Sequence, residues 1–359
     1  MTLSVCLIVK DEEEVIERCL NCVKKFADEI VIVDTGSTDG TVSIVKKFTD
    51  KVYFFKWCDD FSAARNFALD MATQDFVMWL DADDVITDEN IEKILKLKEI
   101  ISEYDMVFML YAAGFDGDKP SFVYDRERIF RRDKNYKFSG AVHEAVTPSG
   151  RIYRSDAVIY HKKIKTGDPF RNLFILQKLI SSGQKLDERQ KFYYGRELLF
   201  NRMYREAIAV LEDFLNGDGW VVNKCEACLD LYRAYSELCD ESRADSSLLR
   251  RFTFAPPSAE ACCILGSRFL DRGEYKSAAY WYESALNTDN CTDSGAFVNL
   301  DYCKFIPNMQ LCVIYHHLGE IKKAYEYNEA AGKIKPDNQN YLYNKKYFEN
   351  LGIRGELND

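Results

Sequence analysis

A run of five apolar residues, Phe76–Leu80, ends directly on three aspartates, Asp81, Asp83 and Asp84. A short apolar run rich in Val and aromatic residues is typical of a strand that is buried on both faces of a parallel sheet. Open α/β sheets bind their ligands in the crevice at the carboxyl ends of such strands. Because only Ala82 separates them, Asp81 and Asp83 can reach one divalent cation from the same side. An ordinary acidic loop is the alternative interpretation.

Two further strand patterns precede this one. Residues 3–9 form an apolar run that leads into the acidic stretch 10–14, and apolar residues then recur at helical spacing as far as residue 26. Residues 29–34 form a second apolar run, which ends on a carboxylate, and a glycine-containing turn follows it. A helix over 41–48 and a third strand over 52–55 complete an alternating order of strands and helices. This order predicts a doubly wound α/β sheet.

Composition restricts the classes of function. The 359 residues are 47% apolar and 30% charged, and their net charge of −10 argues against binding to nucleic acid or to an anionic membrane. The sequence has no run of about 20 apolar residues, so we expect no integral membrane segment. The N-terminus lacks the basic region of a signal peptide. Twelve cysteines without a secretion signal indicate reduced thiols and therefore a cytoplasmic protein.

Three segments taken together point to a known family. LIVKDE at 7–12, IVDTGSTDGT at 32–41 and WLDADD at 79–84 resemble the motifs of inverting glycosyltransferases of family 2. The resemblance covers about residues 1–165 and implies the GT-A fold, a nucleotide-sugar-binding domain with a mixed, mostly parallel sheet. It also implies a uridine-diphosphate (UDP) sugar as donor, with Mn²⁺ or Mg²⁺ held against the diphosphate by Asp81 and Asp83. By the same resemblance, Asp34 contacts the nucleotide base and Asp39 lies close by.

Other residues are assigned to the donor site. Arg65 and Asn66 lie near the start of a predicted helix, where donor groups can meet an anionic ligand, and the similar enzymes use this stretch to line the nucleotide pocket. A surface ion pair is the alternative for Arg65. The basic cluster 126–132 can steady the phosphate of the leaving group, or it can be a solvated edge strand. The remaining predicted donor-site residues are Lys10, Glu12, Ser37, Ala82 and Arg131.

An inverting transfer needs one base that takes the proton of the acceptor. The segment around His143 and Glu144 resembles the acceptor-side wall of similar enzymes, so Glu144 is the predicted base and His143 its helper. Asp84 is the rival candidate for the base, and the choice stays open. His161 follows an apolar run and resembles a late histidine that joins the metal in several GT-A enzymes. A structural hydrogen bond is the alternative role for His161.

The strand patterns stop after residue 165. Residues 166–190 are predicted to be a linker with a connecting helix, and residues 191–359 an all-α domain. Three segments in this half, 194–207, 265–278 and 314–324, repeat one pattern that ends on an alanine, with a glycine near the start of the first two. This pattern is typical of tetratricopeptide repeats with a period of about 34 residues. A degenerate unit is expected to begin near residue 231, and an insertion to lie around 288–301. Stacked repeats of this kind form a concave surface.

The predicted function is metal-dependent transfer of a sugar from a UDP-sugar to an acceptor. The layout, a transferase domain and then helical repeats, is similar to peptide S-glycosyltransferases of the sublancin type, which modify bacteriocin precursors on cysteine. The acceptor is therefore a peptide or protein side chain, or else a saccharide, since enzymes of similar layout also serve surface polysaccharide or lipid-linked sugars. A catalytically degenerate repeat scaffold is the alternative from another class. The repeat domain is also a candidate surface for a homodimer.

Overall fold

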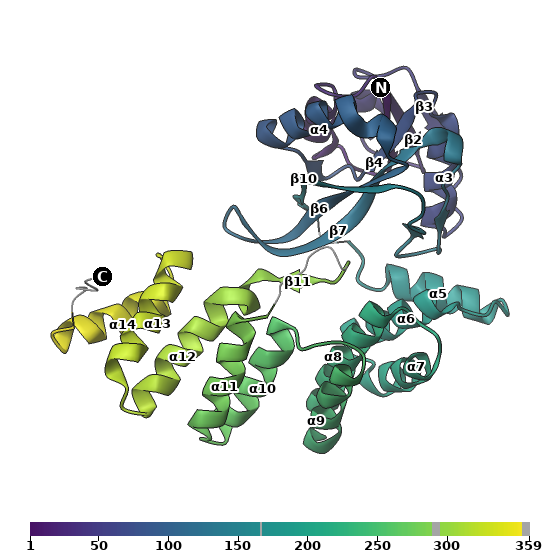
Figure 1. Cartoon of the computed structure of the whole chain (residues 1–359). Helices are drawn as coiled ribbons and strands as arrows, with labels where there is room; N and C mark the ends of the chain where they lie inside the picture. Colours follow the sequence, from purple (N-terminus) through teal and green to yellow (C-terminus); the bar gives the residue numbers. More distant parts are fainter. Residues whose placement is uncertain (166, 289–294, 354–359) are drawn as a thin grey trace.

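The computed structural model describes residues 1–165, 167–288 and 295–353. Figure 1 shows a sheet-containing domain that stands over a curved row of helices, with the hairpin of β6 and β7 reaching down to the row. This arrangement confirms the predicted fold class, a mixed-sheet α/β domain followed by an all-α region. Within the described ranges, every helix is too short or too polar to span a lipid bilayer.

The main sheet contains parallel and antiparallel strands. Its order is β3-β2-β1-β4-β7-β6-β10-β5, and β11 pairs with β7 outside this path. The four strands from β3 to β4 are parallel, whereas β7 runs antiparallel to both of its main neighbours. The strands are β1 (Leu3–Val9), β2 (Glu29–Asp34), β3 (Val52–Phe54), β4 (Phe76–Leu80), β5 (Asp84–Val85), β6 (Met106–Asp116), β7 (Lys119–Arg131), β10 (Ile152–His161) and β11 (Val298–Asn299), and a separate pair is formed by β8 (Phe138–Ser139) and β9 (Ala145–Val146).

Helices cover both faces of this sheet. Along β1, the side chains of Leu3, Val5 and Leu7 face one apolar core with α1 (Ile16–Val23) and α4 (Asp88–Ile100), while Cys6 faces a second core with α3 (Phe61–Met71). Successive side chains of a strand point to opposite faces, which is why the run is apolar throughout. The short α2 (Thr41–Val45) ends before the residue 48 that the sequence pattern predicts.

The carboxyl ends of β1, β2 and β4 lie at one edge of the sheet. Val9 is paired with Asp34, so Lys10 and Thr35 follow at the same level. Leu7 is paired with Leu80, so Asp81 follows β4 at the level of Ile8, two residues earlier along β1. This edge is where the predicted site residues come together.

The helices after the sheet domain form successive antiparallel pairs. A Cβ at Gly195 would lie 2.6 Å from a Leu211 methyl carbon, and a Cβ at Gly266 would lie 2.7 Å from the Tyr282 ring. Both glycines therefore stand where paired helices approach closely. Small residues at these points are the feature that predicted repeats. The helices are α5 (Arg171–Ser181), α6 (Glu188–Phe200), α7 (Tyr204–Asn216), α8 (Val221–Glu237), α9 (Glu241–Arg250), α10 (Ala259–Asp271), α11 (Tyr275–Leu286), α12 (Ile306–His317), α13 (Ile321–Ile334) and α14 (Gln339–Asn350).

Two segments join the helices to the sheet domain. In α5, Ile175 and Leu176 pack against Ala141 and Val142, so this helix of the predicted linker is a buried part of the junction. The expected insertion supplies β11, whose Val298 pairs with Val123 of β7. Residues 289–294 of that insertion lie outside the described residues. The domain boundaries themselves stay a prediction.

Candidate functional site

A cavity of about 540 Å³ opens at the carboxyl edge of the sheet. Its size is in the range of small-molecule and cofactor sites. Loops after β1, β2 and β4 form one wall, and the segment between β8 and β9, together with α5, closes the opposite side. The predicted site residues that line it are Lys10, Glu12, Arg65, Asp81, Ala82, Asp83, His143, Glu144 and His161.

The loop after β4 gathers the candidate metal ligands. Ligand atoms of Asp81, Asp84 and His161 lie within 4.8 Å of one another, close enough to share one ion. Nδ1 of His161 also lies 3.2 Å from Oδ1 of Asp83, and both Asp81 and Asp83 line the cavity. Carboxylates with an imidazole are ligands that Mn²⁺ accepts, whereas Mg²⁺ prefers oxygen ligands alone. The donor set therefore fits a divalent cation, Mn²⁺ better than Mg²⁺.

Asp84 is placed differently from the other two aspartates. Its side chain is fully buried, Oδ1 accepts from the Tyr111 hydroxyl at 2.8 Å, and Oδ2 accepts from the Asp81 amide at 3.0 Å. Arg128, also fully buried, lies 3.5 Å from Oδ2. An acceptor cannot reach a carboxylate in this position. The geometry therefore counts against Asp84 as the base and gives it the role of shaping the loop.

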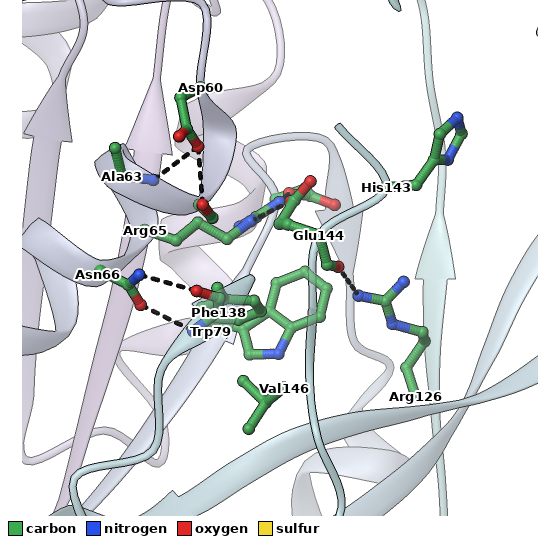
Figure 2. Close-up of polar contacts among 12 residues, drawn as sticks. Asp60, Ala63, Arg65, Asn66, Trp79, Arg126, Phe138, His143, Glu144 and Val146 are labelled. Carbon is green, nitrogen blue, oxygen red and sulfur yellow. Dashed lines mark hydrogen bonds and ion pairs between the residues drawn. The ribbon is translucent and has the colours of Figure 1, made fainter. Parts of the chain in front are cut away.

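Arg65 connects the loop after β4 to the acceptor-side wall (Figure 2). Its Nη2 lies 2.7 Å from Oδ1 of Asp81, and its Nε lies 2.6 Å from Oε1 of Glu144. The guanidinium also stands over the Trp79 ring, at 4.4 Å from the centroid. Arg65 is 7% exposed, so this is a buried bridge between two acids, and the surface ion pair considered for Arg65 is wrong.

Charge within the site shifts several pKa values. Burial alone would raise the pKa of Asp81, but Arg65 and Arg128 hold it below its usual range. The pKa of Glu12 is raised to about 7 by burial and by the neighbouring Asp83. Burial opposes the charged form of His161, yet its bonds to Asp83 and Asp84 raise the pKa to about 10. The crowded acids favour a positive charge at this position, and a bound cation would displace the proton of His161.

His143 and Glu144 point in different directions, as Figure 2 shows. Glu144 is turned to Arg65, while Nε2 of His143 lies 2.7 Å from Oε1 of Glu197 in α6. The backbone of His143 is left-handed, with φ of 52°, a conformation that non-glycine residues rarely adopt. This turn separates the two side chains, so Glu144 faces Arg65 and His143 faces Glu197, although both residues line the cavity.

Asp34, Ser37 and Asp39 stand beside the cavity but do not line it. Asp34 accepts from the amides of Gly36 and Ser37, both at 3.1 Å. Asp39 accepts from the amide of Thr41 at 2.9 Å and of Glu13 at 3.1 Å. These bonds shape the turn after β2, from which Thr35 reaches the cavity. The contact of Asp34 with a nucleotide base stays a prediction.

Asn66 and Arg131 are not brought to the cavity. The amide of Asn66 exchanges two hydrogen bonds with the backbone of Phe138, at 2.9 and 2.8 Å, and so holds β8 (Figure 2). Arg131 lies at the far end of β7, where its guanidinium donates to the backbone carbonyl groups of Ser102 and Tyr104. The stretch 126–132 spans more than one side of the sheet, because side chains alternate along a strand. The predicted donor contacts of both residues are therefore not supported.

Several cavity residues were not assigned individually from the sequence. Tyr124 and Arg126, the first residue of the predicted basic cluster, line the cavity, and Arg128 lies two residues further along β7. A period of two along this strand would have placed these three side chains on one face. Arg171 and Asn172 reach the cavity from α5, and no local pattern announces that this helix folds back. The edge-strand interpretation of the basic cluster is wrong, since β7 lies between β4 and β6.

A mixed sheet that carries acids at the carboxyl end of a buried strand, beside a cavity of this size, defines the nucleotide-sugar-binding class of α/β domain. Residues 4–160 match the family model described as "Glycosyl transferase family 2". The likeness to family 2 glycosyltransferases therefore belongs to this part of the chain, the sheet-containing domain.

Relatives of known name resemble different parts of the chain. The SPbeta prophage-derived glycosyltransferase SunS of Bacillus subtilis is 31% identical over 232 residues, 60% of this chain and 53% of the relative. A TPR repeat-containing protein of Synechococcus elongatus is 36% identical over 150 residues, 41% of this chain and 36% of the relative. The chain thus spans about half the length of SunS and a smaller share, 36%, of the Synechococcus protein. The crystal structure of S. aureus TarS 1-349 is 19% identical with a TM-score of 0.41, over 69% of this chain and 90% of that chain.

Proposed function

We propose that the protein is a metal-dependent, inverting glycosyltransferase that moves a sugar from a UDP-sugar to a peptide or protein side chain. The observation that carries this proposal is the buried bridge from Asp81 through Arg65 to Glu144. It places the acid that would face the donor diphosphate, Asp81, and the candidate base, Glu144, in the lining of one cavity. The family 2 domain supports the sugar transfer. The peptide acceptor rests on the resemblance of the layout to peptide S-glycosyltransferases.

The cation would be held by Asp81, Asp83 and His161, which all line the cavity. Asp81 and His161 also belong to the cluster of ligand atoms within 4.8 Å, whose third member is the buried Asp84 behind the loop. When bound, a divalent cation offsets the negative charge that develops on the departing diphosphate. Lys10 lines the same cavity and adds positive charge there. Arg65 fixes the position of the Glu144 carboxylate, so this group does not have to be ordered during the reaction.

In the transfer, the hydroxyl or thiol of the acceptor attacks the anomeric carbon of the sugar. The new bond to this carbon forms as its bond to the diphosphate oxygen breaks, and the electron pair of that bond leaves with UDP. The proton of the acceptor passes to the carboxylate of Glu144, which lines the cavity. Attack from the face opposite to the leaving group inverts the anomeric configuration.

The test is turnover of a panel of UDP-sugars with Mn²⁺, followed as release of UDP. We expect hydrolysis of at least one donor, its loss with EDTA, and its loss in Asp83→Ala. Asp118→Ala is the matched control, because Asp118 is an exposed aspartate in the turn between β6 and β7. Absence of both turnover and nucleotide binding in the wild type would contradict the proposal and favour a repeat scaffold.

The cellular location and the assembly state belong to the same proposal. The eleven cysteines within the described residues are all free thiols, which supports a reducing compartment such as the cytoplasm. A homodimer formed through the repeat helices remains a prediction, and light scattering of the full chain tests it. A monomer at all concentrations would contradict it.

A further inference from the structure

A second cavity, of about 680 Å³, lies between the sheet domain and the helices. One side is formed by β7 and the segment after β9. The other side is formed by α6, by the start of α8 and by the insertion that carries β11. No residue of the transferase motifs at 7–12, 32–41 or 79–84 lines it. It is therefore a space that exists only because the helical domain is docked.

The two cavities share a wall. Tyr124, Arg126 and His143 line both of them. Arg126 donates to the carbonyl oxygen of Glu144 at 3.2 Å, so the shared wall is attached directly to the residue that carries the candidate base. A group that occupies the second cavity would hold the adjoining part of its molecule beside Glu144.

Helix α6 holds this shared wall from the helical side. Arg189, Tyr193 and Glu197 are spaced four residues apart, so they form one stripe along the helix. All three contact His143: Arg189 donates to its carbonyl oxygen at 3.1 Å, Tyr193 stacks on its ring at 4.1 Å, and Glu197 lies 2.7 Å from its Nε2. The helical domain thus fixes the loop that carries Glu144.

The lining of the second cavity is mainly apolar, and it includes several aromatic side chains. Tyr193, Phe200, Trp220 and Phe297 all contribute, and Phe200 and Trp220 are 60% and 49% exposed. Aromatic rings that are left this open gain by covering one another or an apolar ligand.

Most charged groups of this lining are paired within the protein. Arg126 pairs with Glu127 at 3.4 Å, Arg196 with Asp230 at 3.2 Å, and Asp125 with Arg154 at 3.1 Å. The buried Nε atoms of Arg126 and Arg196, however, have no hydrogen-bond partner among the described residues, and a buried donor without a partner is costly. A polypeptide offers backbone carbonyl oxygens to such donors together with an apolar side chain for the aromatic rings, so the lining favours a polypeptide over a saccharide.

We infer that the second cavity is the acceptor site, and that it binds a polypeptide through an apolar or aromatic side chain next to the residue that receives the sugar. The inference rests on the proposed function, since it names the acceptor of the same reaction. The donor occupies the first cavity, and the nucleophile of the acceptor reaches it past the wall formed by Tyr124, Arg126 and His143.

Two measurements on the full chain test the inference. The first measures the binding of two fluorescein-labelled Gly/Ser decapeptides in the presence of UDP and Mn²⁺. Both peptides carry alanine in place of the nucleophile, and they differ only in whether the residue next to it is Phe or Ser. The second is mass spectrometry of transfer to the matching peptides with Cys, Ser or Thr, beside an oligosaccharide. Donor hydrolysis by the wild type is recorded separately, so a failure of the proposed function is recognised by itself.

We expect the peptide with Phe to bind at least about tenfold more tightly than the peptide with Ser, and this preference to disappear in Phe200→Ala and Trp220→Ala. Phe174→Ala is the matched control, because Phe174 is also 60% exposed but lies on α5 outside the cavity. It should behave as the wild type. Equal binding of both peptides, unchanged binding in Phe200→Ala, or transfer to the oligosaccharide alone would overturn the inference.

Discussion

At the scale of single residues, Arg65 has the most consequential position. It is buried, it bonds to Asp81 and Glu144, and its guanidinium stacks on Trp79. Two acids that belong to different loops are thereby held at a fixed separation. A planar guanidinium can do this because its donors form a rigid fork, which the single ammonium of lysine does not reproduce.

Glu144→Gln separates the chemical role of this glutamate from its structural role. The amide keeps the shape of the side chain but cannot take a proton. We expect kcat for transfer to fall by about 10² to 10⁴-fold, while UDP-sugar binding changes little. Single-turnover kinetics and calorimetry measure the two quantities, with the exposed Glu103→Gln as control. A variant that retains full turnover would exclude Glu144 as the base.

At the scale of elements, Glu29 ties several of them together at the start of β2. It accepts from Ser4 of β1, from Lys51 before β3 and from both donors of Thr73 after α3. Burial alone would raise the pKa of Glu29, but the bonds from Lys51, Ser4 and Thr73 lower it to about 2. The ionised form is therefore part of the folded sheet.

The sign of the resulting pH dependence follows from this lowered pKa. The contribution of Glu29 is fully present above its ordinary pKa of 4.5 and is lost as the pH falls to about 2. It corresponds to about 3 kcal/mol of unfolding free energy at neutral pH. In Glu29→Gln, urea unfolding of the sheet domain should show lower stability at pH 7 and a flatter decline between pH 4.5 and 2. Glu17→Gln, at an exposed position of α1, should keep the wild-type slope.

Glu226 in α8 is the opposite case. Burial raises its pKa to about 7, Arg196 opposes this shift, and Asp230 and Glu260 add to it. The folded helices therefore favour the neutral carboxyl group. Its contribution to stability is fully present below pH 4.5 and is lost as the pH rises to about 7.

Replacement of Glu226 by glutamine should remove this loss. We expect Glu226→Gln to unfold at a higher temperature than the wild type at pH 8, by several degrees, and at nearly the same temperature at pH 4.5. Calorimetry of the full chain at the two pH values measures the difference. Glu206→Gln, an exposed glutamate of α7, is the control. A destabilised Glu226→Gln at pH 8 would show that the charged form is the one that the fold needs.

At the scale of the whole molecule, the insertion in the repeats fastens the helices to the sheet. β11 pairs with β7, and Phe297 stacks on Phe122 with their ring centroids 5.8 Å apart. Lys335 of the helical region lies 2.6 Å from Asp116 at the end of β6. Figure 1 shows β11 beneath β7, between the sheet and the helices.

This fastening gives a prediction about the junction. Phe297→Ala removes the stacked ring, so the short pairing of β11 with β7 should open more often. Hydrogen exchange of the Phe122 and Val123 amides should become at least about tenfold faster, since exchange follows local opening. Amides of β1 and β4, in the sheet core, serve as the internal reference. Unchanged protection at Val123 would mean that Phe297 does not hold the junction closed.

The sequence by itself determined the helices and strands, and the strand ends at which the candidate site residues lie. Apolar runs fix the strands and their faces, and a carboxylate that follows such a run must lie at the carboxyl edge, as Asp81 and Asp83 do. Only the tertiary structure decided which side chains meet. Arg65 reaches Glu144 across 79 positions, and α6 reaches His143 across about 50. Such contacts depend on how helices dock on a finished sheet. A local pattern records the face of a residue but not its partner. For that reason the whole basic cluster 126–132 was predicted near the donor, whereas Arg126 lines the cavity and Arg131 does not.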